Sequence, residues 1–300
     1  MSEHWQQVLA TSAQTGAPVN GIKVACENDA ILEVCGDDAL DFLHAQFCAD
    51  LRQLQNGHGV LTAWCNPKGR VQYLVTVLRD TPSHLWLLVP QTMVEAFSKR
   101  LTMFVLRADV KIEDRSGEFA AVHTLGGVPR DPVPGTSEFS AQHQQWYIVP
   151  LDQLQQSWDL IEGAPAHGET ATTPLIQFGI PYLDPLLVEK FLPQELDLDR
   201  MSGLSFDKGC YPGQEIIARV KFRGEVKRRP RRFTSTDIDL PAAGASLVDA
   251  DGNKKGTVLL AAPNAEDERE ILAVVDNVEA GTELFLDGES KPLTAQSLPD

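Results

Sequence analysis

The sequence lacks the short motifs that mark the commonest nucleotide, hydrolase and metal sites. It contains no P-loop, no GxGxxG after a strand, no GxSxG and no HExxH, which removes the usual phosphate-binding, serine-hydrolase and zinc-protease hypotheses. The seven histidines are scattered, and the five cysteines form no CxxC pair. Zinc and dithiol sites normally need such spacings, so we expect no metal site.

Positive charge is also scarce. The 26 lysines and arginines are outnumbered by 42 acidic residues, and the formal net charge is −16. That field repels phosphate, so direct nucleic-acid binding and attachment to an anionic membrane are not expected. No apolar run is long enough to cross a bilayer, and the first residues lack the basic and apolar regions of a secretory signal. An odd number of cysteines suits a reducing compartment, and we expect a cytoplasmic protein.

The 300 residues are enough for two or three compact units with sizeable cores. In the N-terminal part, apolar periodicity and turn residues predict strands with helices between them, which favours an antiparallel α+β sheet. We expect Asp37 and Asp38 to cap the first helix and Gly57 to end it. In chain order the elements are strands 22–25 and 31–34, a helix 40–54, strands 60–65, 71–79 and 85–89, a helix 91–107 and a strand 110–113.

The remaining elements suggest two further units. Residues 117–164 predict two strands, 119–124 and 146–149, followed by a helix 152–160, with a loop rich in Gly and Pro at 126–135. After Pro230 short strands alternate with turns, which indicates a small barrel or sandwich. These five strands span 232–234, 245–248, 256–261, 270–275 and 282–286.

One thiol stands out, that of Cys210 in the stretch Lys208 to Glu215. Glycines bracket it, and a run that can form a helix follows. A lysine two residues earlier and free helix N–H groups a few residues later would favour the thiolate, whereas Asp207 would oppose it. A small buried cysteine in a tight turn is the alternative, because free cysteine is often buried.

A basic run follows this turn, and an acidic segment precedes it. The basic run could bind a phosphate, a carboxylate tail or an RNA backbone, or it could pair with acidic neighbours. The acidic segment 195–199 could supply acid/base groups or form an exposed edge. The basic run consists of Arg219, Lys221, Arg223, Lys227, Arg228, Arg229, Arg231 and Arg232.

Residues 190–229, with the core KGCYPGQE, resemble the signature region of the YgfZ family of folate-binding proteins. The upstream stretches GDDALDFLHAQFCADL and GVLTAWCNPKGRV are similar to the family's N-terminal pattern. The resemblance covers roughly residues 20–290. It implies kinship with the aminomethyltransferase, or T-protein, of the glycine cleavage system.

The resemblance implies an α+β fold of three domains in a ring, with antiparallel α+β N-terminal and middle domains and a C-terminal β-barrel. The expected domains are 1–116 completed by 165–228, then 117–164, then 229–300. It also implies binding of tetrahydrofolate or a derivative, and a role in assembling or repairing iron-sulfur enzymes and thereby in tRNA modification. The implied partners are folate, iron-sulfur proteins and tRNA-modifying enzymes.

Carried over by position, the family pattern suggests a reactive Cys210 assisted by Lys208. Two positions depart from the T-protein: Asn66 stands where it has an aspartate, and Gln177 where it has a glutamate that would bond the pterin. A neutral amide cannot act as a carboxylate base, although Asp50 could substitute for it. The expected folate-binding residues are Asp50, Asn66, Gln177, Tyr211, Gln214, Glu215, Arg219 and Arg223.

These features lead to a first hypothesis and two alternatives. The first is a folate-binding accessory protein for iron-sulfur enzymes, with Cys210 as a reactive thiol. The second is a folate-dependent aminomethyl or one-carbon transferase. The third is an RNA-binding module that uses the run 219–232.

Overall fold

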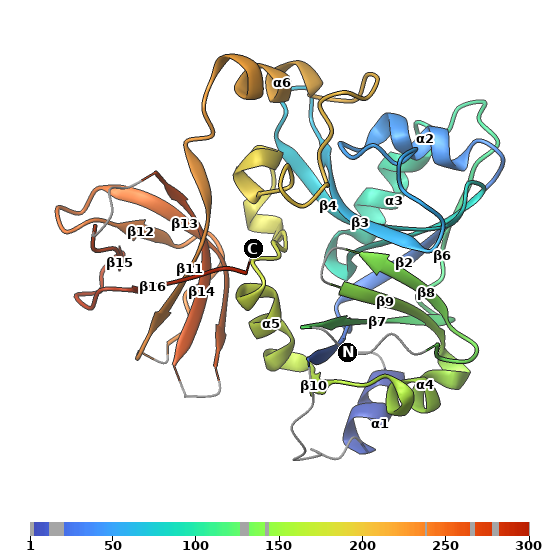
Figure 1. The fold of residues 1–300 in the computed structure, drawn as a ribbon, viewed down its shortest axis with the longest axis horizontal. Helices are drawn as coiled ribbons and strands as arrows, with labels where there is room; N and C mark the ends of the chain where they lie inside the picture. Colours follow the sequence, from blue (N-terminus) through green and yellow to red (C-terminus); the bar gives the residue numbers. More distant parts are fainter. Residues whose placement is uncertain are drawn as a thin grey trace. The chain divides into compact units, whose positions relative to one another are not determined.

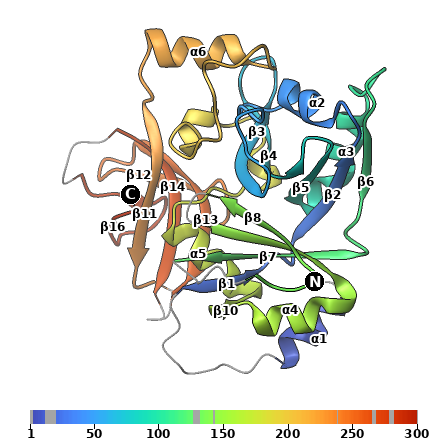
Figure 2. The ribbon, with the colours of Figure 1, turned by 45° about the vertical axis from the view of Figure 1, so that its right-hand side comes forward.

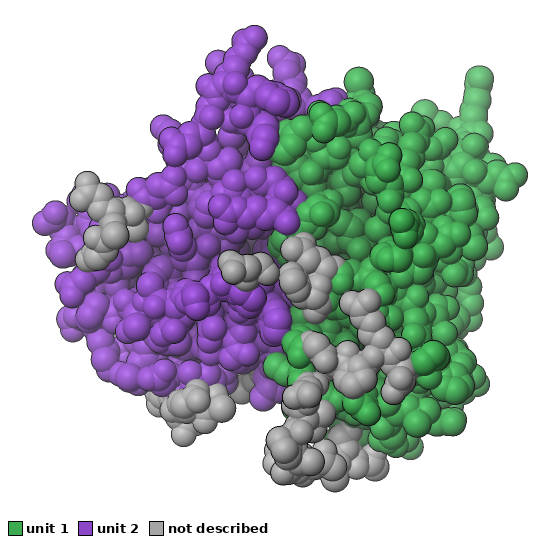
Figure 3. Space-filling view, viewed as in Figure 1, with its two compact units in different colours: residues 1–64, 73–167, 201–212 green, residues 65–72, 168–200, 213–300 purple. Residues whose placement is uncertain are grey.

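The computed structural model describes residues 3–11, 21–126, 132–141, 144–237, 239–264, 268–277 and 282–299. The chain forms two compact units, coloured separately in Figure 3. Unit 1 contains residues 1–64, 73–167 and 201–212, and unit 2 contains residues 65–72, 168–200 and 213–300. The three-domain division expected from the sequence remains a prediction.

Unit 1 is built on a ten-stranded sheet in the order β10-β1-β7-β9-β8-β3-β4-β5-β2-β6. Figures 1 and 2 together label its strands. Most neighbouring strands with a described register are antiparallel, while β1 with β10 and β3 with β8 are parallel. The α+β class is therefore confirmed. The strands are β1 (Ile22–Ala25), β2 (Asp29–Cys35), β3 (His58–Cys65), β4 (Val71–Thr81), β5 (His84–Pro90), β6 (Lys111–Asp114), β7 (Phe119–Leu125), β8 (Ser137–Ala141), β9 (Gln144–Pro150) and β10 (Ala164–Ala166).

Strands β7, β8 and β9 belong to this same sheet, although the sequence suggested a separate unit for them. The expected strands near 119–124 and 146–149 are present, and β8 was missed. The loop expected at 126–135 lies partly outside the described residues.

The helices of unit 1 are α1 (Glu3–Thr11), α2 (Ala39–Gln46), α3 (Val94–Thr102) and α4 (Leu154–Leu160), with 3-10 turns η1 (Gln91–Met93) and η2 (Leu151–Gln153). They cover apolar side chains of the sheet, and one core cluster joins Trp5 on α1 and Trp158 on α4 to Tyr147 on β9. Burying each such side chain contributes roughly 1.5–3 kcal/mol.

Three expectations for the helix at 40–54 were wrong: its end, its cap and the role of Gly57. The helix ends at Gln46, because Phe47 is already extended. The Asp38 carboxylate makes no capping bond; it accepts the Asp109 backbone N–H at 2.8 Å. Gly57, expected to end the helix, lies in the turn before β3 with a positive φ of 73°.

Unit 2 contains a six-stranded sheet in the order β15-β12-β13-β14-β11-β16. All described registers in it are antiparallel, and barrel closure remains a prediction. Its elements are η3 (Gly168–Ala171), α5 (Thr172–Gln177), η4 (Pro185–Leu187), η5 (Pro193–Leu196), α6 (Gln214–Arg223), β11 (Arg228–Ser235), β12 (Ser246–Val248), β13 (Lys254–Pro263), β14 (Arg269–Asp276), β15 (Phe285–Leu286) and β16 (Thr294–Gln296). In the part of the chain that the structure describes, no helix has the length and apolarity needed to cross a membrane.

Candidate functional site

Within unit 1, the segment before Cys210 is hydrogen-bonded to the loop that follows α2. The hydroxyl of Thr62 accepts the backbone N–H of Ala49 at 2.9 Å and donates to the carbonyl of Gly203 at 2.8 Å. The N–H of Ser205 donates to the carbonyl of Cys48 at 2.9 Å. These bonds fix where the cysteine turn begins.

Lys208 anchors the same turn. Its side chain is buried, with 7% exposed, and its Nζ donates to the carbonyls of Phe47 at 2.6 Å, Ala49 at 2.9 Å and also His44. Helix ends leave carbonyls without partners, and a lysine can supply the missing donors. The ammonium therefore closes the C-terminal end of α2.

Burial lowers the pKa of Lys208 to about 8, and the neighbouring Cys48 and Asp50 partly offset this effect. Desolvation disfavours the charged form, whereas nearby negative groups favour it. The lysine was expected to favour the Cys210 thiolate. The bonds described above direct its ammonium to backbone carbonyls.

Cys210 itself is exposed. The neighbouring Tyr211 is buried, with its hydroxyl donating to the carbonyl of Ser205 at 3.2 Å and its ring centroid 5.0 Å from Lys208 Nζ. The turn thus holds an exposed thiol between a buried lysine and a buried tyrosine. The alternative of a buried cysteine is excluded.

Asp50 belongs to this part of unit 1. Its Oδ1 accepts the backbone N–H of Arg52 at 3.1 Å and lies 3.3 Å from Nδ1 of His44. Burial, and then the positive charge of Lys208, lower the pKa of His44, while Asp50 acts in the opposite direction. Asp50, His44 and Lys208 form one coupled polar group.

In unit 2, the end of the motif packs against the turn between β3 and β4. Gly213 has a φ of 82°, and a Cβ there would lie 2.6 Å from the carbonyl oxygen of Asn66 and 2.6 Å from Cα of Gly69. Only glycine combines that backbone with such a close approach. Helix α6 starts directly after it, as the sequence predicted.

Asn66 holds this turn together. Its Oδ1 accepts the backbone N–H groups of Lys68 at 2.9 Å and Arg70 at 3.0 Å, as an amide oxygen often does in turns. The structure thus brings Asn66 together with Gly213 at the start of α6. The side-chain oxygen of Asn66 already accepts hydrogen bonds from two backbone N–H groups.

The other expected folate-binding residues of unit 2 lie in two places. Gln214, Glu215, Arg219 and Arg223 are on α6, where all but the half-buried Gln214 are exposed. Gln177 ends α5 and donates to Oε1 of Glu270 at 3.0 Å, a carboxylate that also accepts from Arg232.

Part of the basic run pairs with the acidic segment in unit 2. Arg229 bonds Asp197 and Asp199, each at 2.6 Å. Arg228 donates to Oε1 of Glu195 at 2.8 and 3.0 Å. For these residues, pairing with acidic neighbours explains the basic run, while Arg219, Lys221, Arg223, Lys227 and Arg231 are exposed.

Glu195 is the centre of a buried network. Its Oε2 accepts the backbone N–H of Leu192 at 2.8 Å and the guanidinium of Arg70 at 3.2 Å. Such charge-assisted bonds from two arginines hold a carboxylate firmly in one orientation.

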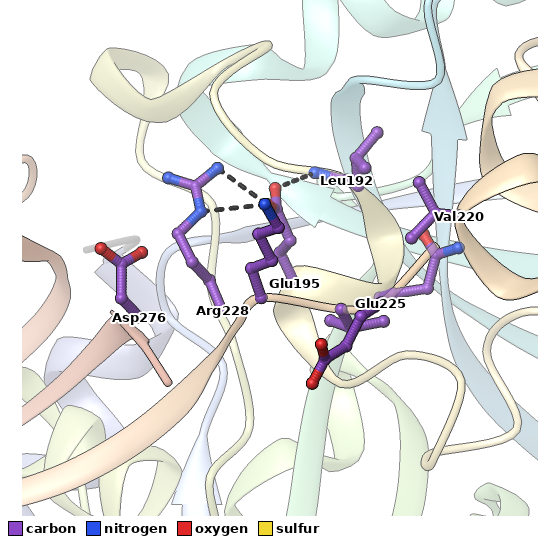
Figure 4. A pocket seen from close by; sticks show the side chains of 9 residues that line it. Leu192, Glu195, Val220, Glu225, Arg228 and Asp276 are labelled. Atoms are coloured by element: carbon purple, nitrogen blue, oxygen red, sulfur yellow. Dashed lines mark hydrogen bonds and ion pairs between the residues drawn. The ribbon is translucent and has the colours of Figure 1, made fainter. Parts of the chain in front are cut away.

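A pocket of about 290 Å³ lies beside this network, within unit 2 (Figure 4). The view shows Arg228 bonded to Glu195, with Asp276 beside the guanidinium. The lining combines apolar side chains with groups of both charges. Its members are Leu192, Gln194, Glu195, Val220, Glu225, Val226, Lys227, Arg228 and Asp276.

Sequence reasoning missed several of these residues. Thr62, His44 and Arg70 act through contacts distant in sequence, and no local pattern identifies them. The stretch that contains His44 and Cys48 was recognised only as part of the family pattern. The pocket could not be expected, because its lining comes from separate parts of the chain: η5 with the preceding Leu192, α6 with residues 225–227, β11 and β14.

Most of the chain is similar in sequence to known bacterial proteins. No protein-family model matches the sequence. Proteins named tRNA-modifying protein YgfZ from Klebsiella pneumoniae and Escherichia fergusonii are 28% and 27% identical over 274 and 278 residues, with 83% of each chain covered. An uncharacterised protein of Haemophilus influenzae is 28% identical over 232 residues, which are 76% of this chain and 80% of that protein.

One solved structure defines the fold. The glycine cleavage system aminomethyltransferase T from Bartonella henselae superposes with a TM-score of 0.71 over 99% of this chain and 89% of that one, at 17% identity. The T-protein-like fold expected from the sequence is confirmed. The chain is therefore a homologue of the proteins named tRNA-modifying protein YgfZ, with the fold of the glycine cleavage aminomethyltransferase.

Proposed function

We propose that the chain is a folate-binding accessory protein that supports the assembly or repair of iron-sulfur enzymes and thereby tRNA modification, with Cys210 as its reactive thiol. The single observation that carries the proposal is the turn around Cys210. It presents an exposed thiol on a segment fixed by the buried Lys208 and Tyr211. A link to tRNA modification is supported by the name of the homologues.

The geometry of the turn supports a chemical role for the thiol. A reactive cysteine must be reachable, and the groups around it must hold it in place. Lys208 contributes by positioning, since its bonds to three carbonyls keep the turn on the end of α2. We expect the thiol to contact an iron-sulfur enzyme or a precursor of its cluster.

For tetrahydrofolate, the residues of unit 2 offer a fit to part of the molecule. Folate combines a flat pterin ring, rich in N–H donors, with carboxylates at its tail. The pocket beside Glu195 has apolar walls from Leu192 and Val226, carboxylates on Glu225 and Asp276, and the cation Lys227. Its volume of about 290 Å³ is just below the range of ligand pockets, which starts at about 300 Å³, so it would hold one end of the molecule. Bound folate would supply a carrier for a one-carbon unit.

The remaining expected residues have different parts in this proposal. Arg219 and Arg223, exposed on α6, would attract the folate tail or a protein partner. Gln177 and Asn66 could pair with a pterin edge as amides. We also propose that folate contacts four further residues: Asp50, Tyr211, Gln214 and Glu215.

The second candidate is a folate-dependent aminomethyl or one-carbon transferase. Its support is the shared fold with an aminomethyltransferase. Asn66 weakens it, since that amide carries no charge and its oxygen accepts two backbone N–H groups. Purified protein with methylenetetrahydrofolate and candidate amine acceptors should show turnover if this candidate is right.

Replacing Cys210 with Ala tests the thiol. In cells that depend on this chain, we expect Cys210→Ala to lower the product of an iron-sulfur tRNA methylthiotransferase about tenfold or more and to raise sensitivity to oxidants. Asp207→Ala is the matched control, because Asp207 is exposed in the same turn, and it should retain function. Unchanged methylthiolation in Cys210→Ala would exclude the thiol from the function.

A further inference from the structure

Unit 1 carries a second cluster of chemically active side chains, on strands β2 and β5 of its sheet. Glu33, Cys35 and His84 each place one possible ligand atom so that all three atoms lie within 4.8 Å of one another. All three residues are half-buried. The cluster is therefore partly shielded from water and partly accessible to it.

The sheet register explains how these residues meet. Glu33 and Cys35 are two positions apart on β2, so their side chains point to the same face. Cys35 lies directly opposite His84 on the antiparallel neighbour β5. Figure 2 shows β2, β5 and β6 running alongside one another. The ligand atoms thus come from rigid strands, which suits a site with fixed geometry.

Neighbouring charged side chains orient these three residues. Nδ1 of His84 lies 2.9 Å from Oδ2 of Asp80, and its Nε2 lies 2.9 Å from Oε1 of Glu33. The guanidinium of Arg115 bonds the other oxygen of Glu33, Oε2, and also Glu118. A carboxylate on the far nitrogen of a histidine is the arrangement that fixes metal-binding imidazoles in proteins.

We propose that Glu33, Cys35 and His84 form a binding site for Zn²⁺. Thiolate, imidazole and carboxylate are all zinc ligands, and three protein ligands leave a fourth position for water or an exchanging group. The ligand atoms would be Cys35 Sγ, His84 Nε2 and Glu33 Oε1. Asp80 would keep its bond to Nδ1, and Arg115 would keep Oε2 in place.

The protons balance in this step. Zinc binding forms bonds to Sγ and Nε2, so the thiol proton and any proton between Nε2 and Oε1 pass to solvent. No oxidant or reductant is needed. Two cations lie near the cluster: Arg115, and Lys111, which is opposite Cys35 on β6 and pairs with Glu113. The carboxylates of Glu33, Asp80, Glu113 and Glu118 outnumber them, so the surroundings favour a divalent cation.

The local sequence contains no sign of this site. Glu33 and Cys35 are separated from His84 by about fifty residues, and neither spacing matches a known zinc motif. The expectation of no metal site rested on short spacings alone. Pairing of β2 with β5 brings the three residues together although they are far apart in the sequence.

The test uses the full-length, untagged protein with Zn²⁺ in competition with a chromophoric chelator, and with Co²⁺ as a spectroscopic probe. We expect one equivalent of Zn²⁺ to bind and Co²⁺ to give a near-ultraviolet charge-transfer band from its bond to sulfur. Cys35→Ser should abolish that band and weaken Zn²⁺ binding at least about tenfold. Asp80→Asn should weaken it about 10–100-fold, because the carboxylate that orients the His84 ring is lost.

Cys210→Ser is the matched control, because an exposed thiol elsewhere could also bind the probe. In that variant the band and the stoichiometry should persist. Because Cys35→Ser and Asp80→Asn are both nearly isosteric, one of them keeps the test informative if the other fails to fold. Absence of stoichiometric zinc binding, or a charge-transfer band that survives in Cys35→Ser, would overturn the proposal.

Discussion

At the scale of single residues, the most informative side chains carry polar groups in buried places. Lys208 is buried, and its Nζ donates to three backbone carbonyls. His123 is 3% exposed and stacks on Trp146 with ring centroids 4.5 Å apart. The free energy of unfolding should therefore depend on both side chains.

Removing the Lys208 ammonium should destabilise unit 1. Lys208→Met keeps most of the side chain but leaves carbonyls of the α2 end without a donor, and an unsatisfied buried group costs about 1–3 kcal/mol. We expect a lower urea midpoint for Lys208→Met. Lys68→Met is the control, since Lys68 is exposed. Equal midpoints for both variants would show that the carbonyls do not depend on this lysine.

His123 should make the protein less stable in mild acid. Burial lowers its pKa to about 4, from an ordinary value of 6.5. Between these values the unfolded chain binds the proton and the folded chain does not, so stability falls as the pH drops below about 6.5. From pH 7 to pH 5 we expect His123 to account for a loss of about 2 kcal/mol.

Urea unfolding at both pH values checks this expectation. His123→Gln cannot titrate, so its stability should change less between pH 7 and pH 5 than that of the wild type. A variant with the same pH dependence as the wild type would contradict the assignment.

At the scale of elements, the motif between Lys208 and Glu215 contains two glycines with different surroundings. A Cβ added at its first glycine, Gly209, would meet no atom of another segment within 4 Å, whereas one at Gly213 would press on the turn of Asn66 and Gly69. The second glycine thus sets where α6 begins. The first one is required by neither packing nor a positive φ.

Substitution of the two glycines should separate these roles. Gly213→Ala adds a Cβ in a left-handed backbone region and against the backbone of Asn66, so we expect a loss of about 1–3 kcal/mol and faster hydrogen exchange along α6. Gly209→Ala should change the stability by less than about 0.5 kcal/mol. Equal effects of the two substitutions would contradict the proposed contact.

Much of this element structure could be predicted from the sequence. Short apolar runs between turn residues located β2, β4, β5 and β7, and the start of α6 followed from the glycine turn. The end of α2 could not be predicted, because the apolar period continues to Leu54 and a distant lysine takes the last carbonyls. Likewise, α3 ends at Thr102, and the exposed Leu106 has a φ of 49°.

At the scale of the whole molecule, the sequence predicted the T-protein-like fold that the structure shares with the aminomethyltransferase, whereas the clusters of interacting side chains could not be predicted. The cluster of Glu33, Cys35 and His84 and the pairing of Arg229 with Asp197 and Asp199 depend on contacts between distant segments. That pairing also explains how a chain of net charge −16 can hold a dense basic run. Some cations of the run form ion pairs with acidic side chains inside unit 2.

The central claim is that this chain binds folate. Calorimetric titration of the purified protein with tetrahydrofolate tests it most directly, with a thermal melt as a second readout. We expect one molecule to bind per chain and the melting temperature to rise with ligand concentration, because a ligand that binds only the folded state stabilises it. No heat of binding and no thermal shift at millimolar tetrahydrofolate would contradict the claim.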